Sequence, residues 1–155
     1  MVTLEHGLRR DEELAQRIYQ ALLDLQPINV LALPNVRAAV EDGQVTLSGN
    51  VATASQAAAI RRAVRALPGV RAVASKLFDD GNLHLDVWEA LAGAPELRGV
   101  DRRLRVVFGI VYVDWAVRSA ELEETADRAL GALPGVRHVV HGDWPEDEYR
   151  RGHAA

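Results

Sequence analysis

The most constraining feature of the chain is an internal repeat. Residues 66–71 read ALPGVR, and the same six residues recur 66 positions later at 132–137. A repeat of this length is one supersecondary unit, so the sequence predicts two small domains of related fold. The same offset also pairs residues elsewhere in the chain: Leu25 with Leu91, Gly43 with Gly109, Val45 with Val111, and Thr53 with Ser119.

Composition narrows the class of protein. The chain has 155 residues, 48% of them hydrophobic and 26% charged, which is typical of a soluble globular protein. The net charge of −4 disfavours nucleic-acid binding, because neutralising phosphates requires a dense basic surface. The absence of cysteine excludes disulfides and thiolate chemistry.

The first 16 residues contain no uninterrupted apolar run of the kind that a signal peptide carries. No apolar run reaches the length of about 18 residues that a membrane span needs. We therefore expect no transmembrane segment and a cytoplasmic location, or a periplasmic one if a leader has been removed.

The first repeat predicts the order helix, strand, strand, helix, strand. A helix begins near Asp11 and ends before Pro27, and a hairpin turn follows at Asp42-Gly43, where glycine tolerates positive φ. Thr53 and Gln56 form a capping box for a second helix, which ends at Pro68-Gly69 before a last strand at residues 70–77.

The second repeat predicts the same order. Its first helix spans residues 82–92, and Gly109 separates strands at 104–108 and 110–117. Ser119 caps the next helix, which ends at Pro134-Gly135 before a strand at 136–140. An apolar stripe on the first of these helices comprises Leu83, Val87, Trp88 and Leu91.

The predicted fold class is α+β, with two αββαβ units. Each unit is a three-stranded mixed sheet with two helices on one face, which leaves the other face open. The predicted domains are residues 11–78, residues 79–142 and a polar tail at 143–155.

The first repeat resembles the BON domain. The resemblance lies in the string VEDGQVTLSGNV at residues 40–51 and in a helix closed by LPGVRAV at 67–73. Residues 79–142 resemble a diverged second copy, in which Trp115 stands where the first copy has Gly49. Proteins of this family include bacterial periplasmic stress proteins and lipid-associated outer-membrane proteins. The resemblance implies a non-catalytic module that associates with phospholipid surfaces or with other proteins.

The chain offers few candidates for chemistry. His138, His141 and Asp143 are metal-compatible residue types, but residues three apart on a strand point to opposite faces, so we predict no metal site. Asp79 and Asp80 precede Gly81 and are interpreted as a solvated turn. Since no nucleotide-binding loop or nucleophile motif occurs, we predict neither enzymatic activity nor a cofactor.

Two surface patterns are candidates for binding. Arg61, Arg62 and Arg65 lie on the predicted outer side of the second helix, and the equivalent helix of the second repeat is acidic. This contrast is read as two solvated faces, as a contact between repeats, or as a basic patch for anionic lipid or another acidic partner.

The second pattern lies on the open face of the sheet. Glu41, Gln44, Thr46 and Ser48 give a polar face in the first repeat. The equivalent residues of the second repeat are Val107, Ile110, Tyr112 and Asp114, of which three are apolar or aromatic. Exposed apolar patches usually mark interfaces, although a register error of one residue would exchange the two faces.

We therefore expect a non-enzymatic binding or assembly module. It would self-associate, for example as a homodimer, or bind a protein partner through Val107, Ile110 and Tyr112. The alternative is a peripheral phospholipid-binding protein that uses Arg61, Arg62 and Arg65. Five glycines are predicted to serve the turns and strand ends: Gly43, Gly49, Gly69, Gly109 and Gly135.

Overall fold

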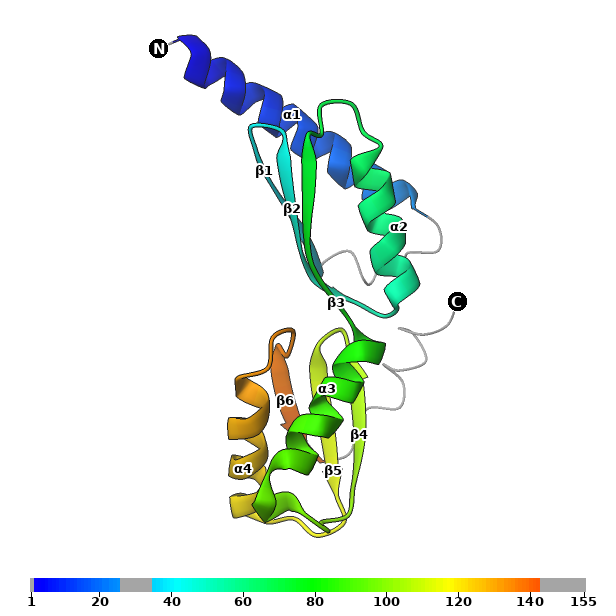
Figure 1. Cartoon of the computed structure of the whole chain (residues 1–155), viewed down its shortest axis with the longest axis vertical. Helices are drawn as coiled ribbons and strands as arrows, with labels where there is room; N and C mark the ends of the chain where they lie inside the picture. Colours follow the sequence, from blue (N-terminus) through cyan, green and yellow to red (C-terminus); the bar gives the residue numbers. More distant parts are fainter. Residues whose placement is uncertain (1, 26–34, 143–155) are drawn as a thin grey trace.

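The computed structural model describes residues 2–25 and 35–142, and the predicted polar tail at 143–155 lies outside the described residues. The chain forms two α+β units placed end to end along its long axis (Figure 1). Unit 1 comprises residues 2–79 and unit 2 comprises residues 80–142.

Both units have the element order α-β-β-α-β. Unit 1 contains α1 (Val2–Asp24), β1 (Val36–Glu41), β2 (Gln44–Val51), α2 (Ala54–Arg65) and β3 (Ala72–Asp79). Unit 2 contains α3 (Asp80–Gly93), the short 3₁₀ helix η2 (Pro95–Leu97), β4 (Arg102–Val107), β5 (Ile110–Trp115), α4 (Ala120–Gly131) and β6 (His138–His141). The predicted fold class is confirmed.

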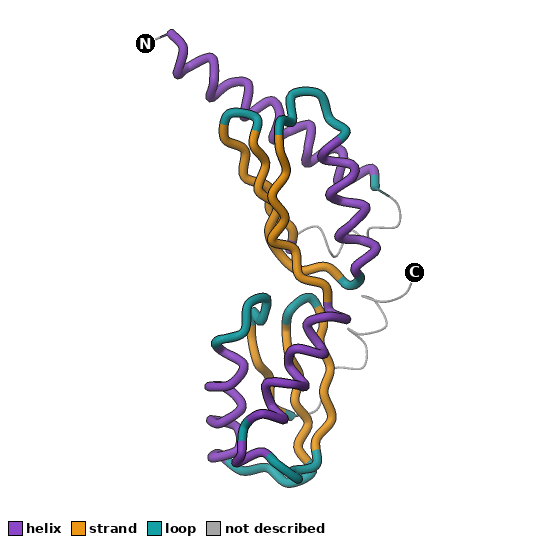
Figure 2. Tube along the Cα trace, in the orientation of Figure 1, coloured by secondary structure: helices purple, strands orange, loops and turns teal. Residues whose placement is uncertain are grey.

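The two sheets have the same topology. In unit 1, β2 pairs antiparallel with β1 and parallel with β3; in unit 2, β5 pairs in the same way with β4 and β6. Both helices of each unit lie on one side of its sheet, so each unit has two layers (Figure 2). The hairpin registers correspond at the repeat offset, since Glu41 pairs with Gln44 and Val107 pairs with Ile110.

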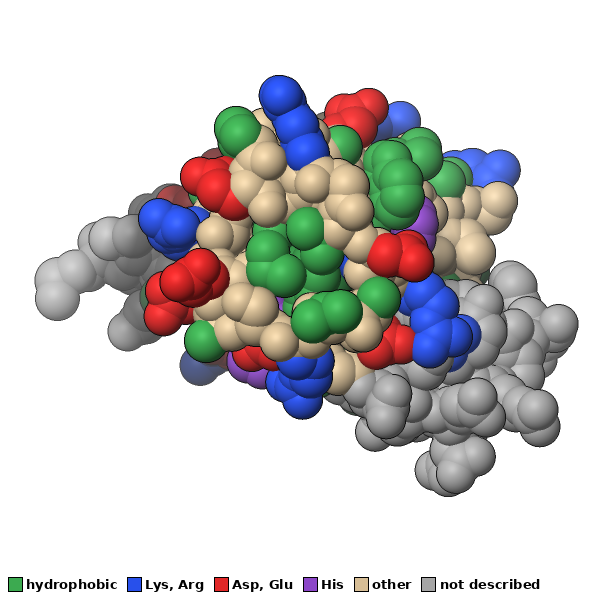
Figure 3. All heavy atoms as spheres, turned by 90° about the horizontal axis from the view of Figure 1, so that it is seen from below, with side chains coloured by type: hydrophobic (Ala, Val, Ile, Leu, Met, Phe, Trp, Pro, Cys, Tyr) green, Lys and Arg blue, Asp and Glu red, His purple; other side chains and the backbone are tan. Residues whose placement is uncertain are grey.

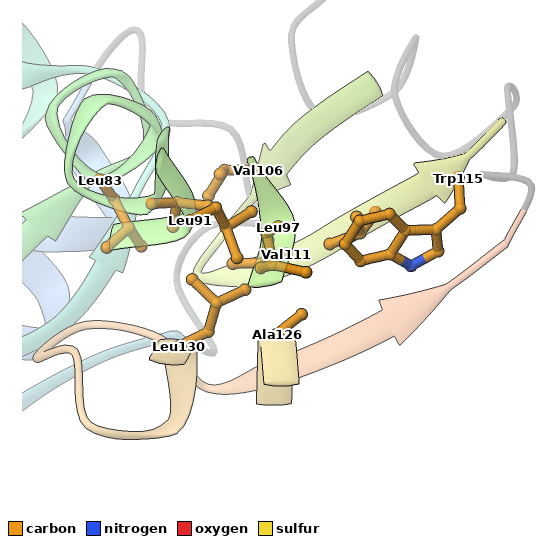
Figure 4. Close-up of a cluster of buried hydrophobic side chains, with 10 residues drawn as sticks. Leu83, Leu91, Leu97, Val106, Val111, Trp115, Ala126 and Leu130 are labelled. Atoms are coloured by element: carbon orange, nitrogen blue, oxygen red, sulfur yellow. The ribbon is translucent and has the colours of Figure 1, made fainter. Parts of the chain in front are cut away.

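Each unit has its own hydrophobic core between its sheet and its helices. In unit 1 it contains Leu14, Ile18 and Leu22 of α1, together with side chains of β2 and α2. In unit 2 it contains Leu83, Val87 and Leu91 of α3, as well as Leu97, Val106, Val111, Trp115, Ala126 and Leu130 (Figure 4). The buried residues of β5 include Val111 and Val113, which places the expected side chains on the helix-covered face.

The first helix differs from its prediction. It begins at Val2 instead of near Asp11, so Asp11 lies within the helix. The buried residues Leu14, Ile18 and Leu22 correspond to Leu83, Val87 and Leu91, an offset of 69 residues instead of 66. The pairing of Leu25 with Leu91 is therefore wrong by about one helical turn.

No loop separates the two units. β3 ends at Asp79 and α3 begins at Asp80. Asp79 is the N-cap of α3, and its side chain accepts a hydrogen bond from the backbone N–H of Asn82 at 3.0 Å. The last residue of one unit therefore caps the first helix of the next.

Candidate functional site

Both predicted hairpins are present, and their turns have the same geometry. Gly43 and Gly109 each have a φ of +78°, and the preceding residues, Asp42 and Phe108, have φ values of +49° and +46°. A two-residue hairpin turn of this kind places both central residues in the left-handed region. Aspartate adopts that region more readily than phenylalanine does, so the turn of unit 2 is the more strained of the two.

A carboxylate from the first helix of each unit holds its hairpin turn. In unit 1, Asp11 accepts hydrogen bonds from the backbone N–H groups of Asp42 at 2.8 Å and Gly43 at 3.2 Å. In unit 2, Asp80 accepts from Phe108 at 2.8 Å and Gly109 at 3.1 Å. The two turns are thus fixed to their helices by the same pair of hydrogen bonds.

Asp80 corrects the prediction of a solvated turn, because its side chain is 4% exposed. Burial raises the pKa of Asp80 to about 6, against the lowering effect of the hydrogen bonds from Phe108 and Gly109, and the neighbouring Asp79 raises it further. A pKa this high sets Asp80 apart chemically from an ordinary surface aspartate.

The two units meet at a joint built around Asn50. This residue ends β2 and is 4% exposed, and its Nδ2 donates a hydrogen bond to the Gly135 carbonyl at 2.8 Å. A Cβ added at Gly109 would lie 2.4 Å from Asn50 Nδ2, and one at Gly135 would lie 2.7 Å from the ring of Phe78. Both glycines are therefore required by close approach across the joint.

An arginine completes the joint. Arg137 Nη1 donates to Asn35 Oδ1 at 2.7 Å and to the Phe108 carbonyl at 3.1 Å. It thus connects unit 1 with the hairpin of unit 2. The sequence gives no local sign of this contact, because Asn35 and Arg137 lie 102 positions apart.

The corresponding end of unit 1 is an open cleft of about 760 Å³. Its lining includes Asp11, Asp42, Gly43, Gly69 and Arg71, together with residues of the first turns of α1. These residues correspond to Asp80, Phe108, Gly109, Gly135 and Arg137, which form the unit 2 side of the joint. The cleft is therefore the unit 1 counterpart of a surface that is covered in unit 2.

The predicted interface residues lie on the open sheet face of unit 2. Val107 and Ile110 are half-buried, and Tyr112 is 8% exposed. The register places Ile110 beside Val107 and His138, and places Tyr112 between Arg105 and Val140. Arg103 and Asp114 form an ion pair at the end of the same face that lies farther from the joint. Whether this face binds a partner stays a prediction.

The largest exposed apolar side chains of unit 2 lie elsewhere. Trp88 of α3 is 51% exposed, so its prediction as part of a buried stripe is wrong. Leu85 is 60% exposed and Val117 is 72% exposed. The guanidinium of Arg102 lies over the Trp88 ring at 5.6 Å from its centroid. The sequence carried a signal of this outer apolar face, because Leu85 and Trp88 fall between the core positions of the helix.

The arginine patch lies on α2. Arg62 and Arg65 are exposed in its last turn, and Arg61 is half-buried. On α4, Glu121, Glu124 and Asp127 are exposed, and Glu123 pairs with Arg118 at 2.9 Å. The structure places the two helices in different units, each against its own sheet (Figure 1).

The two candidate histidines do not share an environment. His138 is exposed, whereas His141 accepts a hydrogen bond at Nδ1 from Trp115 Nε1 at 3.0 Å, and its Nε2 lies 2.8 Å from Asp127 Oδ1. Among the described residues, no group of three or more potential ligands is placed to hold a metal ion. Asp143 lies outside the described residues.

Position 49 explains the departure between the repeats. Gly49 has a φ of +125°, and a Cβ there would lie 1.7 Å from the Asn35 carbonyl oxygen. Trp115 is 5% exposed and packs in the unit 2 core, and it pairs across the sheet with Arg102. The glycine therefore permits close approach of the backbone that precedes β1, while the tryptophan fills the core.

The comparisons with known proteins agree with the topology of unit 1. The model of the BON domain family matches residues 10–77. These residues form a BON domain. The match ends before unit 2, which shares the element order and register of the BON domain; its membership of the family stays a prediction. A search of curated proteins finds no match.

Two solved structures resemble the chain. One is the C-terminal domain of CdsD, described as the structural protein of the type III secretion system of Chlamydia trachomatis, with a TM-score of 0.63 and 19% identity over 87% of this chain and 67% of that chain. A second structure of CdsD has a TM-score of 0.41 and 14% identity, over 88% of this chain and 95% of that one. The first likeness shows a shared fold.

Proposed function

We propose that the chain is a non-enzymatic assembly module that binds a protein partner, a second copy included, through the open sheet face of unit 2. The observation that carries this proposal is the contrast between two equivalent faces. The BON domain presents Glu41 and Gln44 where unit 2 presents Val107 and Ile110, on strands with the same register. Apolar side chains on a face without helices gain free energy when a partner removes them from water.

Further features support a binding role. Each unit uses its buried residues for its own core, and the described residues contain no cluster that would hold a metal ion. The fold likeness to a structural protein of a secretion system agrees with a role in assembly. Within the described residues, no helix combines the length and apolar character that a membrane-spanning segment needs.

The test replaces the unit 2 face with residues that the equivalent face already carries. The double variant Val107→Glu, Ile110→Gln installs the counterparts of Glu41 and Gln44, so it is compatible with the fold. If apolar burial carries association, the parent's self-association persists in 1 M NaCl and weakens about ten-fold or more in the variant. Gln44→Glu is the matched control on the BON domain.

The measurement is light scattering over a range of concentrations, beside circular dichroism to confirm folding. An unchanged mass for the folded double variant would contradict a role for this face in self-association. Binding of a different protein would then have to be tested with that protein as the probe.

The second candidate function is binding of anionic phospholipid through α2. It is favoured by the exposure of Arg62 and Arg65 in one helical turn, with Arg61 beside them. Each cation contributes about 1 kcal/mol near an anionic surface, so three give weak, salt-sensitive binding. Co-sedimentation with phosphatidylserine vesicles, lost in the triple variant with Gln at the three positions, would support it. Equal sedimentation of parent and variant would contradict it.

A further inference from the structure

The open end of the BON domain repeats the geometry of a surface that is already a binding surface within this chain. Gly69 and Gly135 have φ values of +94° and +92°, following the shared value of +78° at Gly43 and Gly109. The backbone N–H of Arg71 donates to the Gly43 carbonyl at 2.8 Å, and that of Arg137 donates to the Gly109 carbonyl at 2.8 Å. The two ends thus present the same carbonyls and the same arginine.

One of these ends is filled and the other is open. A Cβ at Gly135 would strike Phe78 at 2.7 Å, whereas the nearest atom to a Cβ at Gly69 is Arg17 Nη2 at 3.7 Å. The cleft of about 760 Å³ lies at Gly43 and Gly69, where unit 2 has the joint. The first turns of α1, which have no counterpart in unit 2, flank this cleft.

The far end of unit 2 has the place in its repeat that the Asn35–Asn50 end has in unit 1. Asp101 lies 66 positions after Asn35, is exposed, and precedes β4 as Asn35 precedes β1. Seen end-on, this tip of the molecule has hydrophobic side chains near its middle with acidic and basic side chains around them (Figure 3). Val117, 72% exposed, follows β5 in the turn near Asp101, since the Ala116 N–H donates to the Asp101 carbonyl at 3.1 Å.

We propose that a second copy of this chain docks the far end of its unit 2 into the open cleft of the BON domain, in a head-to-tail contact that repeats the internal joint. The pair corresponding to Arg137 and Asn35 is then Arg71 of one copy and Asp101 of the next, which are oppositely charged. The contact is a different surface from the open sheet face. Because it joins unlike surfaces, it generates a ring or a filament instead of a closed dimer.

The contact between copies is weaker than the internal joint. Ala116 stands where Asn50 stands in unit 1, so the side-chain donor to the glycine carbonyl is missing. The internal joint is also supported by the direct passage of β3 into α3. Association through the cleft therefore depends on concentration and on the ion pair, and it weakens with added salt.

Charge reversal tests the pair. Arg71→Asp and Asp101→Arg each place like charges in the contact, and each raises the dissociation constant by about ten-fold or more. The double variant restores the pairing with the charges exchanged and recovers association. Arg65→Asp, at an exposed position of α2, is the control. The measurement is sedimentation velocity at low salt, carried out in the Val107→Glu, Ile110→Gln background so that the sheet face does not contribute.

The lack of cysteine in the chain allows a second measurement. Folded Arg71→Cys and Asp101→Cys proteins, mixed and treated with a short bismaleimide, form a crosslinked heterodimer, while Arg71→Cys mixed with Glu124→Cys does not. A species that stays monomeric at all concentrations, equal crosslinking in both mixtures, or a double variant that fails to recover association would overturn the proposal.

Discussion

Units 1 and 2 hold their hairpins with the same two hydrogen bonds, but the carboxylates that accept them differ in burial. Asp11 is partly exposed beside an open cleft, whereas Asp80 is 4% exposed beneath the joint. Burial raises the pKa of Asp80 to about 6. The comparison teaches that docking one unit on another changes the chemistry of a residue whose local geometry stays the same.

The largest expected effect tests the contrast between Gly49 and Trp115. Gly49→Ala should lower the free energy of unfolding by roughly 3–5 kcal/mol, because the added Cβ meets the Asn35 carbonyl and the residue has positive φ. Chemical denaturation measures it. Gly131→Ala is the control, since no neighbouring atom lies within 4 Å of its Cβ, and it should be neutral or slightly stabilising. A Gly49→Ala variant as stable as the parent would mean that the two units tolerate the same residues at this strand end.

A slightly smaller effect tests the burial of Asp80. Its pKa is raised above the unfolded value of 3.8 to about 6, so the folded state binds the extra proton between these values. The contribution of Asp80 to stability is therefore fully present below pH 4 and is lost as the pH rises through 6, by about 3 kcal/mol. The unfolding free energy of the parent minus that of Asp80→Asn should fall by this amount between pH 4 and pH 7. A difference that does not change with pH would show that Asp80 ionises like a surface aspartate.

The two hairpin glycines give the next comparison. Gly43→Ala and Gly109→Ala should each cost roughly 1–3 kcal/mol, because both positions have a φ of +78°. Gly109→Ala should cost more, since its Cβ also meets Asn50 across the joint. Thermal unfolding of the two variants measures the order. Equal costs would indicate that the joint yields without loss of stability.

The smallest effect concerns the helix caps. Thr53 accepts a hydrogen bond from the Gln56 N–H at 3.2 Å, whereas Ser119 makes no side-chain capping bond. Thr53→Ala should cost about 1 kcal/mol, and Ser119→Ala no more than about 0.5 kcal/mol. Urea denaturation at a fixed pH measures both. The reverse order would show that Ser119 caps its helix in solution.

Much of the fold could be predicted because its signals are local. The glycine turns, the capping box of Thr53 and Gln56, and the strand alternation each depend on residues a few positions apart. The repeat then carried these predictions from unit 1 to unit 2. For the first helices the offset misled, because Asp11 corresponds to Asp80 at 69 residues, while an offset of 66 aligns it with Leu77.

The joint could not be predicted, because it depends on how two folded units meet. Asn50 and Gly135 are 85 positions apart, and nothing in either segment distinguishes a buried amide from a surface one. The outer apolar face of α3 could have been predicted, since Leu85 and Trp88 exceed what one buried stripe requires. The apolar residues on the open sheet face were recognised, but their role depends on a partner.

The direct passage from β3 into α3 has a mechanical consequence. A tensile load applied across the two units passes through the peptide bond between Asp79 and Asp80, with no slack segment to extend first. The strand on one side is paired parallel with β2 along its length, so the load shears its hydrogen bonds together instead of opening them one at a time. In an assembly under tension, the chain would therefore behave as a stiff spacer of fixed length until one of its units gives way.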